Sequence, residues 1–379
     1  MKKILFRKLL LDCLTFFLVA LLSASIIIWV FQAVNFLDIM IEDGRDYLVY
    51  INYSILNFPK ILSKVLPFVF FFSFFYIISK YEINNELIIF WNFGIDKFQL
   101  INFLFKFSIF LALLQILLSA FIVPKSLDTA RSFLRSSSVN FLENFIKEKK
   151  FNDTIKGVTI YSDTKDDNGN LENIYLKKDD SKNSFQITYA KKGNFIKLND
   201  SQILVLYEGE TINIVNNKIT NFKFSKSDLN LKNFKTNTTT YIKTQEVSSF
   251  KLIKCFLNLK NLKFFNIDTK DVIIENCQNE NLNNIIRELY KRFIIPFYLP
   301  SLMLIVLFLI LRSKESINYF NYRIFIFILG LLLIISSEMT LRFIQNDFLK
   351  NMKIFLLPLI IISCIYIIFY YYLNRLQQK

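Results

Sequence analysis

Residues 14–34 read LTFFLVALLSASIIIWVFQAV, a run without a single charged side chain. A helix needs roughly 20 such residues to cross about 30 Å of hydrocarbon, so this run is long enough to span a membrane. Five further apolar runs follow, at Pro59–Ser79, Leu100–Val123, Phe293–Leu311, Tyr322–Leu341 and Ile354–Leu373. The sequence therefore predicts a membrane protein with six spans, arranged as three before and three after a polar insert.

The polar insert runs from Pro124 to Glu288 and changes its periodicity along the way. Its first part, Pro124 to about Lys150, has apolar residues at helical spacing. Short alternating segments then follow at 158–160, 171–176, 185–189, 203–207, 211–215 and 219–224. We read the glycines in Asp167–Asn170, Lys192–Asn194 and Glu208–Glu210, and the pair Asn216-Asn217, as turns between strands. Helices are expected again at Ser248–Leu259 and at Leu282–Arg292, the latter running into the fourth span.

These patterns predict an α-helical membrane protein with six transmembrane helices and an inserted, jelly-roll-like β domain. Residues 1–123 hold the first three spans, 124–288 the insert and 289–379 the last three. Lysine and arginine, which favour the cytoplasmic side, gather at the two ends of the chain and between spans four and five. The loop after the first span carries four acidic residues against Arg45. We therefore expect both termini in the cytoplasm and the insert on the opposite side.

The composition argues against an enzyme. The chain has no histidine, the commonest general base and metal ligand, and only seven glycines. Neither G-x-x-x-x-G-K-[ST] nor G-x-G-x-x-G occurs, so we expect no nucleotide site, no metal and no cofactor. The net charge of +15 fits either a nucleic-acid partner or lysines that flank spans. Because lysine is dense in the polar middle, solvated surface is the favoured interpretation and no nucleic acid is expected.

The segment Tyr81–Gly94, YEINNELIIFWNFG, joins spans two and three. As a helix it places Leu87, Phe90 and Trp91 on one face, and it places Glu82 and Glu86 one turn apart on another. Gly94 permits a helix stop. Two interpretations stay open. The segment either joins two spans at the membrane surface, or it docks into an arginine-lined groove of a cytoplasmic partner.

The order of three spans, a β-rich insert and three spans resembles the lipopolysaccharide export permeases LptF and LptG. Local motifs agree: Glu86–Gly94 resembles the coupling segment of that family, and Glu288–Pro296 resembles the start of span four. Gly157–Tyr161 and Asp166–Tyr175 resemble the opening strands of its external domain. Trp29–Asp38 is similar to the end of the first span in LptF, which favours LptF over LptG. The stretch Leu257–Asn283 has no match and reads as an insertion.

The resemblance implies a non-catalytic permease subunit of an ATP-driven exporter in the bacterial inner membrane. Such an exporter extracts lipopolysaccharide and passes it to a periplasmic β-structured bridge. The implied partners are an LptG-like permease, an LptB-like ATPase dimer, an LptC-like single-span protein and an LptA-like periplasmic carrier. Spans one and five are then expected to gate a lipid cavity. The alternative is a membrane-anchored scaffold or sensor whose periplasmic β domain binds a partner protein.

The same resemblance implies roles for particular residues. The ATPase-coupling candidates are Glu82, Glu86, Leu87, Phe90, Trp91 and Gly94. Candidates for lipid phosphate contacts are Lys125, Arg131, Arg135 and Arg342, which otherwise anchor the helices at the interface. Candidates for a periplasmic lipid conduit are Phe185, Ile187, Ile203 and Val205, whose alternative role is to pack a closed core.

Two further pairs of residues stay open in the sequence. Glu338 lies one turn before Arg342, which fits either an ion pair or a proton-relay carboxylate. Cys255 and Cys277 would lie in an oxidising space, where a disulfide is one alternative.

Overall fold

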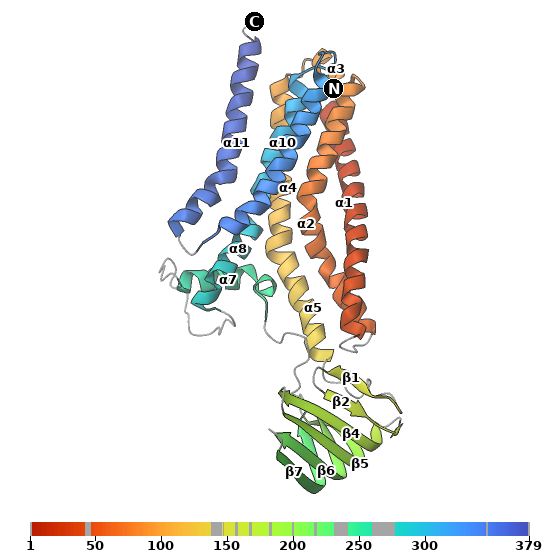
Figure 1. Ribbon diagram of the computed structural model, residues 1–379. Helices are drawn as coiled ribbons and strands as arrows, with labels where there is room; N and C mark the ends of the chain where they lie inside the picture. Colours follow the sequence, from red (N-terminus) through yellow and green to blue (C-terminus); the bar gives the residue numbers. More distant parts are fainter. Residues whose placement is uncertain are drawn as a thin grey trace. The chain divides into compact units, whose positions relative to one another are not determined.

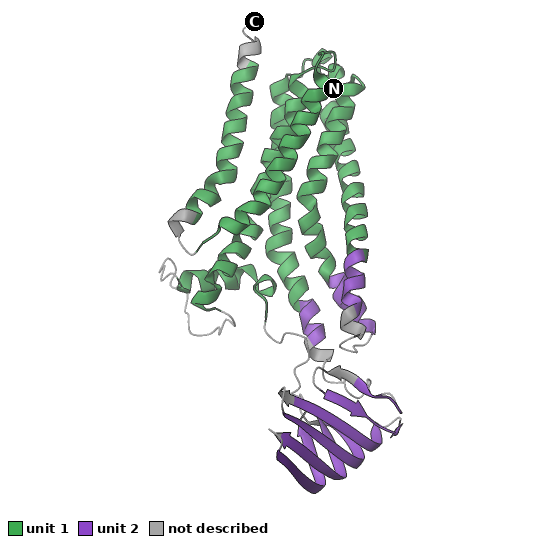
Figure 2. Ribbon diagram, viewed as in Figure 1, with its two compact units in different colours: residues 1–30, 57–128, 242–379 green, residues 31–56, 129–241 purple. Residues whose placement is uncertain are grey.

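The computed structural model describes residues 2–41, 47–137, 146, 148–155, 158–166, 169–181, 184–198, 201–215, 218–230, 242–259, 277–345 and 348–377. The chain forms two compact units (Figure 2). Unit 1 comprises Met1–Val30, Asn57–Asp128 and Ile242–Lys379, and unit 2 comprises Phe31–Leu56 and Thr129–Tyr241.

Six helical segments of the described chain are long and apolar enough to cross a membrane, as the six apolar runs predict. The helices of the chain are α1 (Lys2–Ile41), α2 (Tyr47–Ile83), α3 (Glu86–Asn92), α4 (Lys97–Leu117), α5 (Val123–Ser137), α7 (Ser249–Leu259), α8 (Leu282–Phe293), α9 (Tyr298–Leu307), α10 (Tyr319–Met339) and α11 (Phe348–Gln377) (Figure 1). A π-helical turn, η1 (Leu118–Ile122), joins α4 to α5. Short 3-10 turns are η4 (Thr244–Glu246), η5 (Asn279–Asn281), η6 (Ile295–Phe297), η7 (Phe308–Leu311) and η8 (Thr340–Phe343).

The core of unit 1 forms around α9. Every residue from Tyr298 to Leu307 is buried, as expected for a helix that is apolar on all sides. In contrast, the buried residues among the described side chains of α1 form one stripe with a spacing of four, made by Leu9, Cys13, Phe17, Leu21 and Ser25. Many of the remaining apolar side chains of α1 point outward, as they would toward lipid or another membrane helix.

Helices α2 and α10 approach closely at Gly330. A Cβ atom at this position would lie 2.1 Å from two ring carbons of Phe71, which is fully buried. The Phe71 ring also packs against Phe75 and Phe327, with centroids 5.8 Å and 5.9 Å away. A glycine at position 330 is therefore what allows this helix pair to pack.

Of the helix expected from Pro124 to Lys150, the structure describes α5 as far as Ser137, while residues 138–145 and 147 lie outside the described residues. Lys149 lies in a turn with φ +56°, so the prediction is wrong at that end. The helix expected at Leu282–Arg292 does run into the fourth span, since α8, η6 and α9 follow one another within one helical segment, Asn279–Leu311. The tighter turn η6 lies between α8 and α9, because Pro296 has no N–H to continue an α-helical ladder.

The β unit is one twisted antiparallel sheet with the strand order β1-β2-β4-β5-β6-β7, in which β3 pairs with β4. Its strands are β1 (Asn152–Ile155), β2 (Val158–Tyr161), β3 (Thr164–Lys165), β4 (Asn170–Ser181), β5 (Ser184–Leu198), β6 (Ser201–Val215) and β7 (Lys218–Asn230). A second sheet, which a jelly roll would need, is not among the described residues.

Two predicted turns in the β unit are wrong. Gly193 and Gly209 lie inside β5 and β6, so the strand expected at 185–189 continues to Leu198, and the two strands expected at 203–207 and 211–215 are one. A Cβ at Gly193 would meet the Ile174 side chain at 2.3 Å, and one at Gly209 would meet the Tyr189 carbonyl oxygen at 2.3 Å. These glycines therefore permit close packing, whereas Gly169 does form the predicted turn, with φ +78°.

The core of the β unit lies on one face of its sheet. Leu171, Ile174, Leu176, Ala190, Leu204 and Leu206 are buried there, with Val158 and Ile160 of β2. The opposite face carries the alternate residues of β5 and β6, which are less covered.

Candidate functional site

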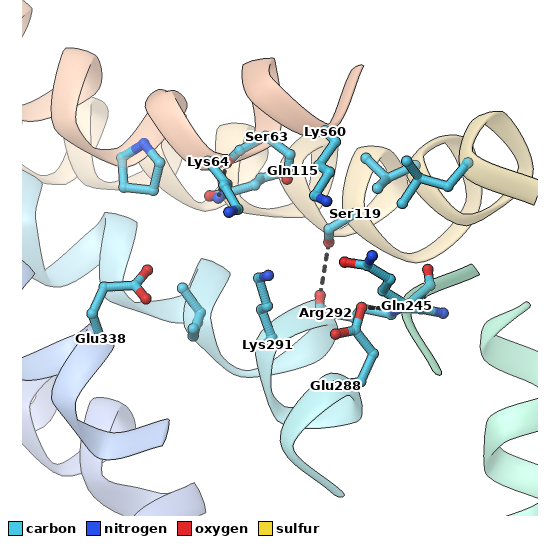
Figure 3. A pocket seen from close by; sticks show the side chains of 14 residues that line it. Lys60, Ser63, Lys64, Gln115, Ser119, Gln245, Glu288, Lys291, Arg292 and Glu338 are labelled. Atoms are coloured by element: carbon cyan, nitrogen blue, oxygen red, sulfur yellow. Dashed lines mark hydrogen bonds and ion pairs between the residues drawn. The ribbon is translucent and has the colours of Figure 1, made fainter. Parts of the chain in front are cut away.

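A polar cavity lies within unit 1 between α2, α4, α8 and α10 (Figure 3). It encloses about 580 Å³ of empty space, counting the part that is open to solvent. Its charged and amide side chains are Lys60, Lys64, Gln115, Gln245, Glu288, Lys291, Arg292 and Glu338. We call it the lysine pocket, because the amino groups of Lys60, Lys64 and Lys291 all face its interior.

Local sequence explains how these side chains reach the lysine pocket. Lys60 and Lys64 are one helical turn apart on α2, so they share a face. Lys291 lies in the last turn of α8, just before the chain turns at Pro296. Three segments that are distant along the chain thus bring three amines to one cavity.

The pocket has more positive than negative charge. Arg292 is neutralised by Glu288, whose Oε1 lies 3.0 Å from its Nε. Lys60, Lys64 and Lys291 make no ion pair or hydrogen bond with the described part of the chain, and Glu338 is the remaining carboxylate of the lining. An amine without a partner is costly inside a membrane protein. The arrangement therefore suits an anionic ligand with several oxygen acceptors.

Gln115 adds a second requirement for a ligand of the lysine pocket. It is buried, and its Oε1 atom has no hydrogen-bond partner, while its Nε2 donates to the Ser63 carbonyl at 3.5 Å. Because a buried acceptor without a donor costs free energy, the occupant of the pocket should also carry a hydrogen-bond donor, such as a hydroxyl, an amide or water.

Arg292 builds one wall of the lysine pocket. It is almost fully buried, and its Nη atoms donate to the carbonyls of Gln245 and Val247, each at 2.9 Å, and to Ser249 Oγ at 2.9 Å. Its own carbonyl accepts from Ser119 Oγ at 2.9 Å, at the π-helical turn of the third span. The segment that returns from residue 242 is thereby fixed to the third and fourth spans.

The lysine pocket was not predicted from the sequence. Lys60 and Lys64 interrupt an apolar run, so that they read as lysines that extend to the membrane surface. Lys291 is more than 200 residues away along the chain. A detectable signal was the pair of lysines one turn apart inside a span, because ionisable residues within spans usually have a functional reason.

The predicted phosphate candidates do not line the lysine pocket. Lys125 is exposed and Arg131 half-buried on α5, while Val123 and Leu127 of that helix do line it. The side chain of Arg135 lies outside the described residues. Arg342 is exposed in η8, where the 3-10 geometry ends the α-helical spacing from Glu338. Glu338 and Arg342 form no ion pair with each other. Glu338 faces the lysines of the pocket instead.

The predicted coupling segment forms the helix α3, with Gly94 just after it at φ +66°. Leu87 and Phe90 are buried in the core of unit 1, with Trp91 partly buried against it and Lys97 Nζ 5.8 Å from its ring. The exposed apolar side chains are instead Ile88, Ile89 and Phe93. The face that is free for a partner is therefore not the one that the helix pattern picked out.

The two coupling glutamates have different surroundings. Glu82 Oε1 accepts from the Lys314 backbone N–H at 3.0 Å, and Lys314 Nζ donates to the Ile83 carbonyl at 3.0 Å. Glu82 thus holds the loop between the fourth and fifth spans. Glu86 is half-buried in the first turn of α3 and accepts from Asn84 Nδ2 at 3.3 Å.

The predicted conduit residues lie on the less covered face of the β sheet. Phe185 and Ile187 on β5 alternate with the buried Thr188 and Ala190 of the core face. Ile203 is half-buried, and Val205 is buried. The sheet thus has apolar side chains on both faces, and the conduit candidates are outside its main core cluster.

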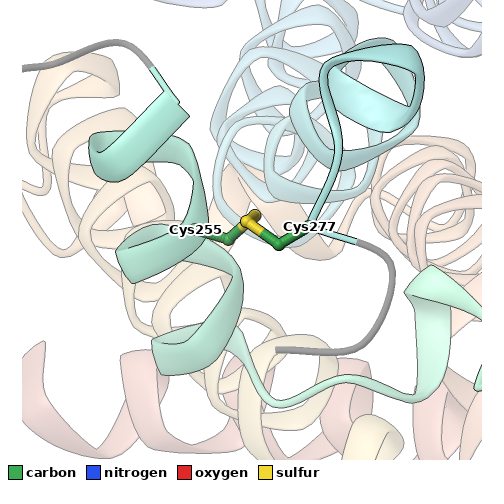
Figure 4. Close-up of a disulfide and its surroundings, with 2 residues drawn as sticks. All are labelled: Cys255 and Cys277. Carbon is green, nitrogen blue, oxygen red and sulfur yellow. A yellow bond between two sulfur atoms is a disulfide. The ribbon is translucent and has the colours of Figure 1, made fainter. Parts of the chain in front are cut away.

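Cys255 of α7 and Cys277 form a disulfide, with Cα atoms 5.9 Å apart (Figure 4). Cys255 is buried against α8, where it packs with Leu252 and Ile285. The bond ties the helix that follows η4 to the start of α8. Most of the unmatched stretch Leu257–Asn283 lies outside the described residues. Among the described residues, no cluster of three or more His, Cys, Asp or Glu could hold a metal ion.

Comparison with known proteins gives two similarities. A family model described as "Lipopolysaccharide export system permease LptF/LptG" matches residues 7–372. A curated protein of Rickettsia prowazekii (strain Madrid E), named "Uncharacterized protein RP871", is 23% identical over 198 residues, which cover 52% of this chain and 55% of that relative. The chain therefore spans about half the length of the curated relative that it matches.

Proposed function

Because the chain belongs to the family of lipopolysaccharide export system permeases LptF/LptG, we propose that it is one permease subunit of an ATP-driven exporter. In this role it takes lipopolysaccharide from the inner membrane and passes it toward a periplasmic β-structured bridge. The chain carries no nucleotide-binding motif, so ATP is hydrolysed by a separate cytoplasmic protein that docks at α3.

An external energy source follows from the substrate. Each methylene that leaves the hydrocarbon costs ~0.8 kcal/mol, and a lipid with several acyl chains totals on the order of tens of kcal/mol. A permease reduces this cost by offering apolar surface to the chains and charged groups to the head. The outward apolar side chains of α1 and α10 supply the first requirement.

The observation that carries the proposal is the lysine pocket. Lys60, Lys64 and Lys291 present donors to one cavity, and no carboxylate of the described chain pairs with them. Phosphate groups on a lipid head supply the missing negative charge, and charge-assisted hydrogen bonds to phosphate are among the stronger ones in proteins. Sugar hydroxyls or amides of the head would satisfy Gln115 Oε1.

The disulfide supports the orientation that the charges predict. Disulfides persist in the periplasm and are rare in the cytoplasm. The Cys255–Cys277 bond therefore favours a periplasmic location for α7 and for the beginning of α8. In that orientation the lysine pocket lies in the periplasmic half of the spans, and α3 faces the cytoplasm.

The proposed partners are a second permease of the LptG type and an ATPase dimer of the LptB type. A single-span protein of the LptC type and a carrier of the LptA type would continue the β-structured path. The edge strand β7 suits such a continuation, because β6 is its one partner among the described strands and its outer edge is open for strand addition.

Lipid binding in nanodiscs tests the phosphate site. Lipopolysaccharide and its dephosphorylated form are titrated against the complex carrying Lys60→Gln, Lys64→Gln and Lys291→Gln together. We expect the affinity for the phosphorylated lipid to fall about tenfold or more, with little change for the other lipid. Lys353→Gln is the matched control, since Lys353 is exposed on α11. Equal affinity of the unmodified protein for both lipids would contradict the proposal.

A further inference from the structure

Helix α7 lies where several spans of unit 1 end. In its first turn, Ser249 Oγ donates to the carbonyl of Ala120, near the end of the third span, at 2.5 Å. Arg292, at the start of the fourth span, donates to the same hydroxyl at 2.9 Å. Farther along α7, Phe256 and Leu259 belong to an apolar cluster with residues from the end of the fifth span and the beginning of the sixth, which are Leu341, Ile344, Ile354 and Phe355. Helix α7 therefore lies at the level where the third to sixth spans end, away from α3 (Figure 1).

The surface of α7 is more apolar than the protein covers. The residues of α7 that pack against the rest of unit 1 are Ser249, Leu252, Cys255, Phe256 and Leu259. A second apolar stripe, with the helical spacing i, i+3, i+7, consists of Phe250, Ile253 and Leu257. Phe250 is 71% exposed and Ile253 is 38% exposed, while Leu257 is half-buried. We call these three residues the outer stripe of α7.

The disulfide keeps the outer stripe turned away from the protein. Cys255 is fully buried, and its bond to Cys277 joins α7 to the segment just before α8 (Figure 4). A disulfide permits only a narrow range of distances between its two Cα atoms. Rotation of α7 about its axis would therefore break either this bond or the packing of Cys255 against Ile285. The outer stripe cannot turn inward while the bond is intact.

Basic residues border the outer stripe. Lys251, Lys254 and Asn258 share a third face of α7, again with the spacing i, i+3, i+7, and α7 contains no acidic residue. Lys251 is exposed. An apolar stripe bordered by lysines is typical of helices that lie in the membrane–water interface, where acyl chains surround the apolar side chains and anionic headgroups attract the amines.

We propose that α7 is an interfacial anchor, in which Phe250, Ile253 and Leu257 insert into the adjacent lipid leaflet and Lys251 binds the phosphate of anionic phospholipid headgroups. Lipid is the occupant that the position of α7 favours, because the ends of the membrane spans beside it already border the leaflet. The turn η4 and Val247 directly precede α7, so the anchor also holds the Gln245 wall of the lysine pocket at a fixed depth. This inference does not depend on which lipid the protein exports.

Spin labels on the full chain test the anchor. The chain carries Cys364→Ser and is reconstituted into phosphatidylcholine vesicles with or without phosphatidylglycerol. Labelling is done without reductant, so that the disulfide stays closed, and uses one site at a time. Ile253→Cys reports the outer stripe and Asn258→Cys the polar face. Leu332→Cys, exposed on α10 within the fifth span, is the reference for lipid. Collisions of each label with oxygen, which partitions into lipid, and with a water-soluble nickel complex are measured by electron paramagnetic resonance.

We expect the label at Ile253 to collide with oxygen as the label at Leu332 does, and the label at Asn258 to collide with the nickel complex. In vesicles that contain phosphatidylglycerol, Lys251→Gln should lower the ratio of lipid-embedded to water-exposed label at Ile253 roughly fivefold. In phosphatidylcholine alone, the same substitution should have little effect. Lys353→Gln is the matched control, because it removes the same charge from an exposed position on another helix and should leave the ratio unchanged.

Three results would overturn the inference. The first is a label at Ile253 that collides with the nickel complex as often as the label at Asn258. The second is a label at Ile253 that neither reagent reaches, because the outer stripe would then be covered by protein, either a second copy or another partner. The third is an equal effect of Lys251→Gln in both kinds of vesicle, which would exclude the contact with anionic headgroups.

Discussion

Single residues decide the electrostatics of the lysine pocket. The three amines were not predicted, because sequence patterns report which face of a helix a residue occupies, whereas the pocket depends on how three distant segments meet. Glu338 shows the same limit. Its spacing predicted either an ion pair with Arg342 or a proton relay. In the structure Glu338 lines the pocket, and Arg342 is out of α-helical register with it because α10 changes to a 3-10 turn after Met339.

Glu338→Gln should strengthen binding of phosphorylated lipid. The substitution removes a negative charge from the lining while keeping its size, so that the attraction between the amines and phosphate rises. With about 1 kcal/mol of Coulomb energy, the value for unit charges about 4 Å apart in bulk water, the affinity should increase roughly fivefold. Titration at low and high salt measures this. Weaker binding by Glu338→Gln would show that the carboxylate itself contacts the lipid head.

Gly330→Ala should destabilise the bundle by about 1–3 kcal/mol, the usual cost of overpacking a core. The new methyl group would overlap the Phe71 ring, which Phe75 and Phe327 keep in place. Phe71→Leu removes the ring, so the cost of Gly330→Ala should be smaller in the double variant. Thermal unfolding in detergent measures all three proteins. Additive effects would contradict the contact.

At the scale of elements, the periodicity of the sequence predicted that a helix or strand exists better than it predicted which residues that element contacts. The helix α3 was expected from its sequence, but which face would be buried was not determined, because its aromatic and aliphatic residues occur on all sides. In the sheet, Gly193 and Gly209 read as turns because glycine often ends strands. Only the contacts with Ile174 and Tyr189 show that they serve close packing inside strands.

The two sides of α3 should respond differently to substitution. Glu86→Lys or Ile88→Asp should weaken docking of the ATPase and leave the fold intact, since Glu86 is half-buried and Ile88 exposed. Loss of a charge-assisted contact costs ~1.5–3 kcal/mol, or roughly tenfold to a hundredfold in affinity. Leu87→Ala should instead destabilise the bundle by about 2–5 kcal/mol. Copurification and unfolding curves distinguish the two effects, and normal docking of Glu86→Lys would exclude that contact.

The disulfide is a separate element that the sequence left open, because spacing alone does not determine geometry. Cys255→Ser with Cys277→Ser should lower stability by about 3 kcal/mol, as expected for a loop of this length. Since Arg292 holds the preceding segment by hydrogen bonds, the variant should still fold. Alkylation of the unmodified protein without reductant should leave both sulfurs unlabelled; labelling there would contradict the bond.

At the scale of the whole molecule, the sequence predicted six apolar helices and the strands between the third and the fourth, since hydrophobic length is a strong signal. It also predicted that a sheet would form. The jelly roll stays a prediction, because the number and pairing of layers depend on contacts between distant strands, which alternation alone does not specify.

The orientation that the charge asymmetry predicts can be measured directly. A cysteine at Lys192, which is exposed on β5, should react with a membrane-impermeant maleimide in cells whose outer membrane alone is opened. A cysteine at Lys314, in the loop beside α3, should react only after the inner membrane is broken. Both labels use a protein with Cys364→Ser, so that the exposed native thiol does not contribute. The reverse pattern would place α3 outside the cytoplasm, where no ATPase could reach it, and would contradict the proposed docking helix.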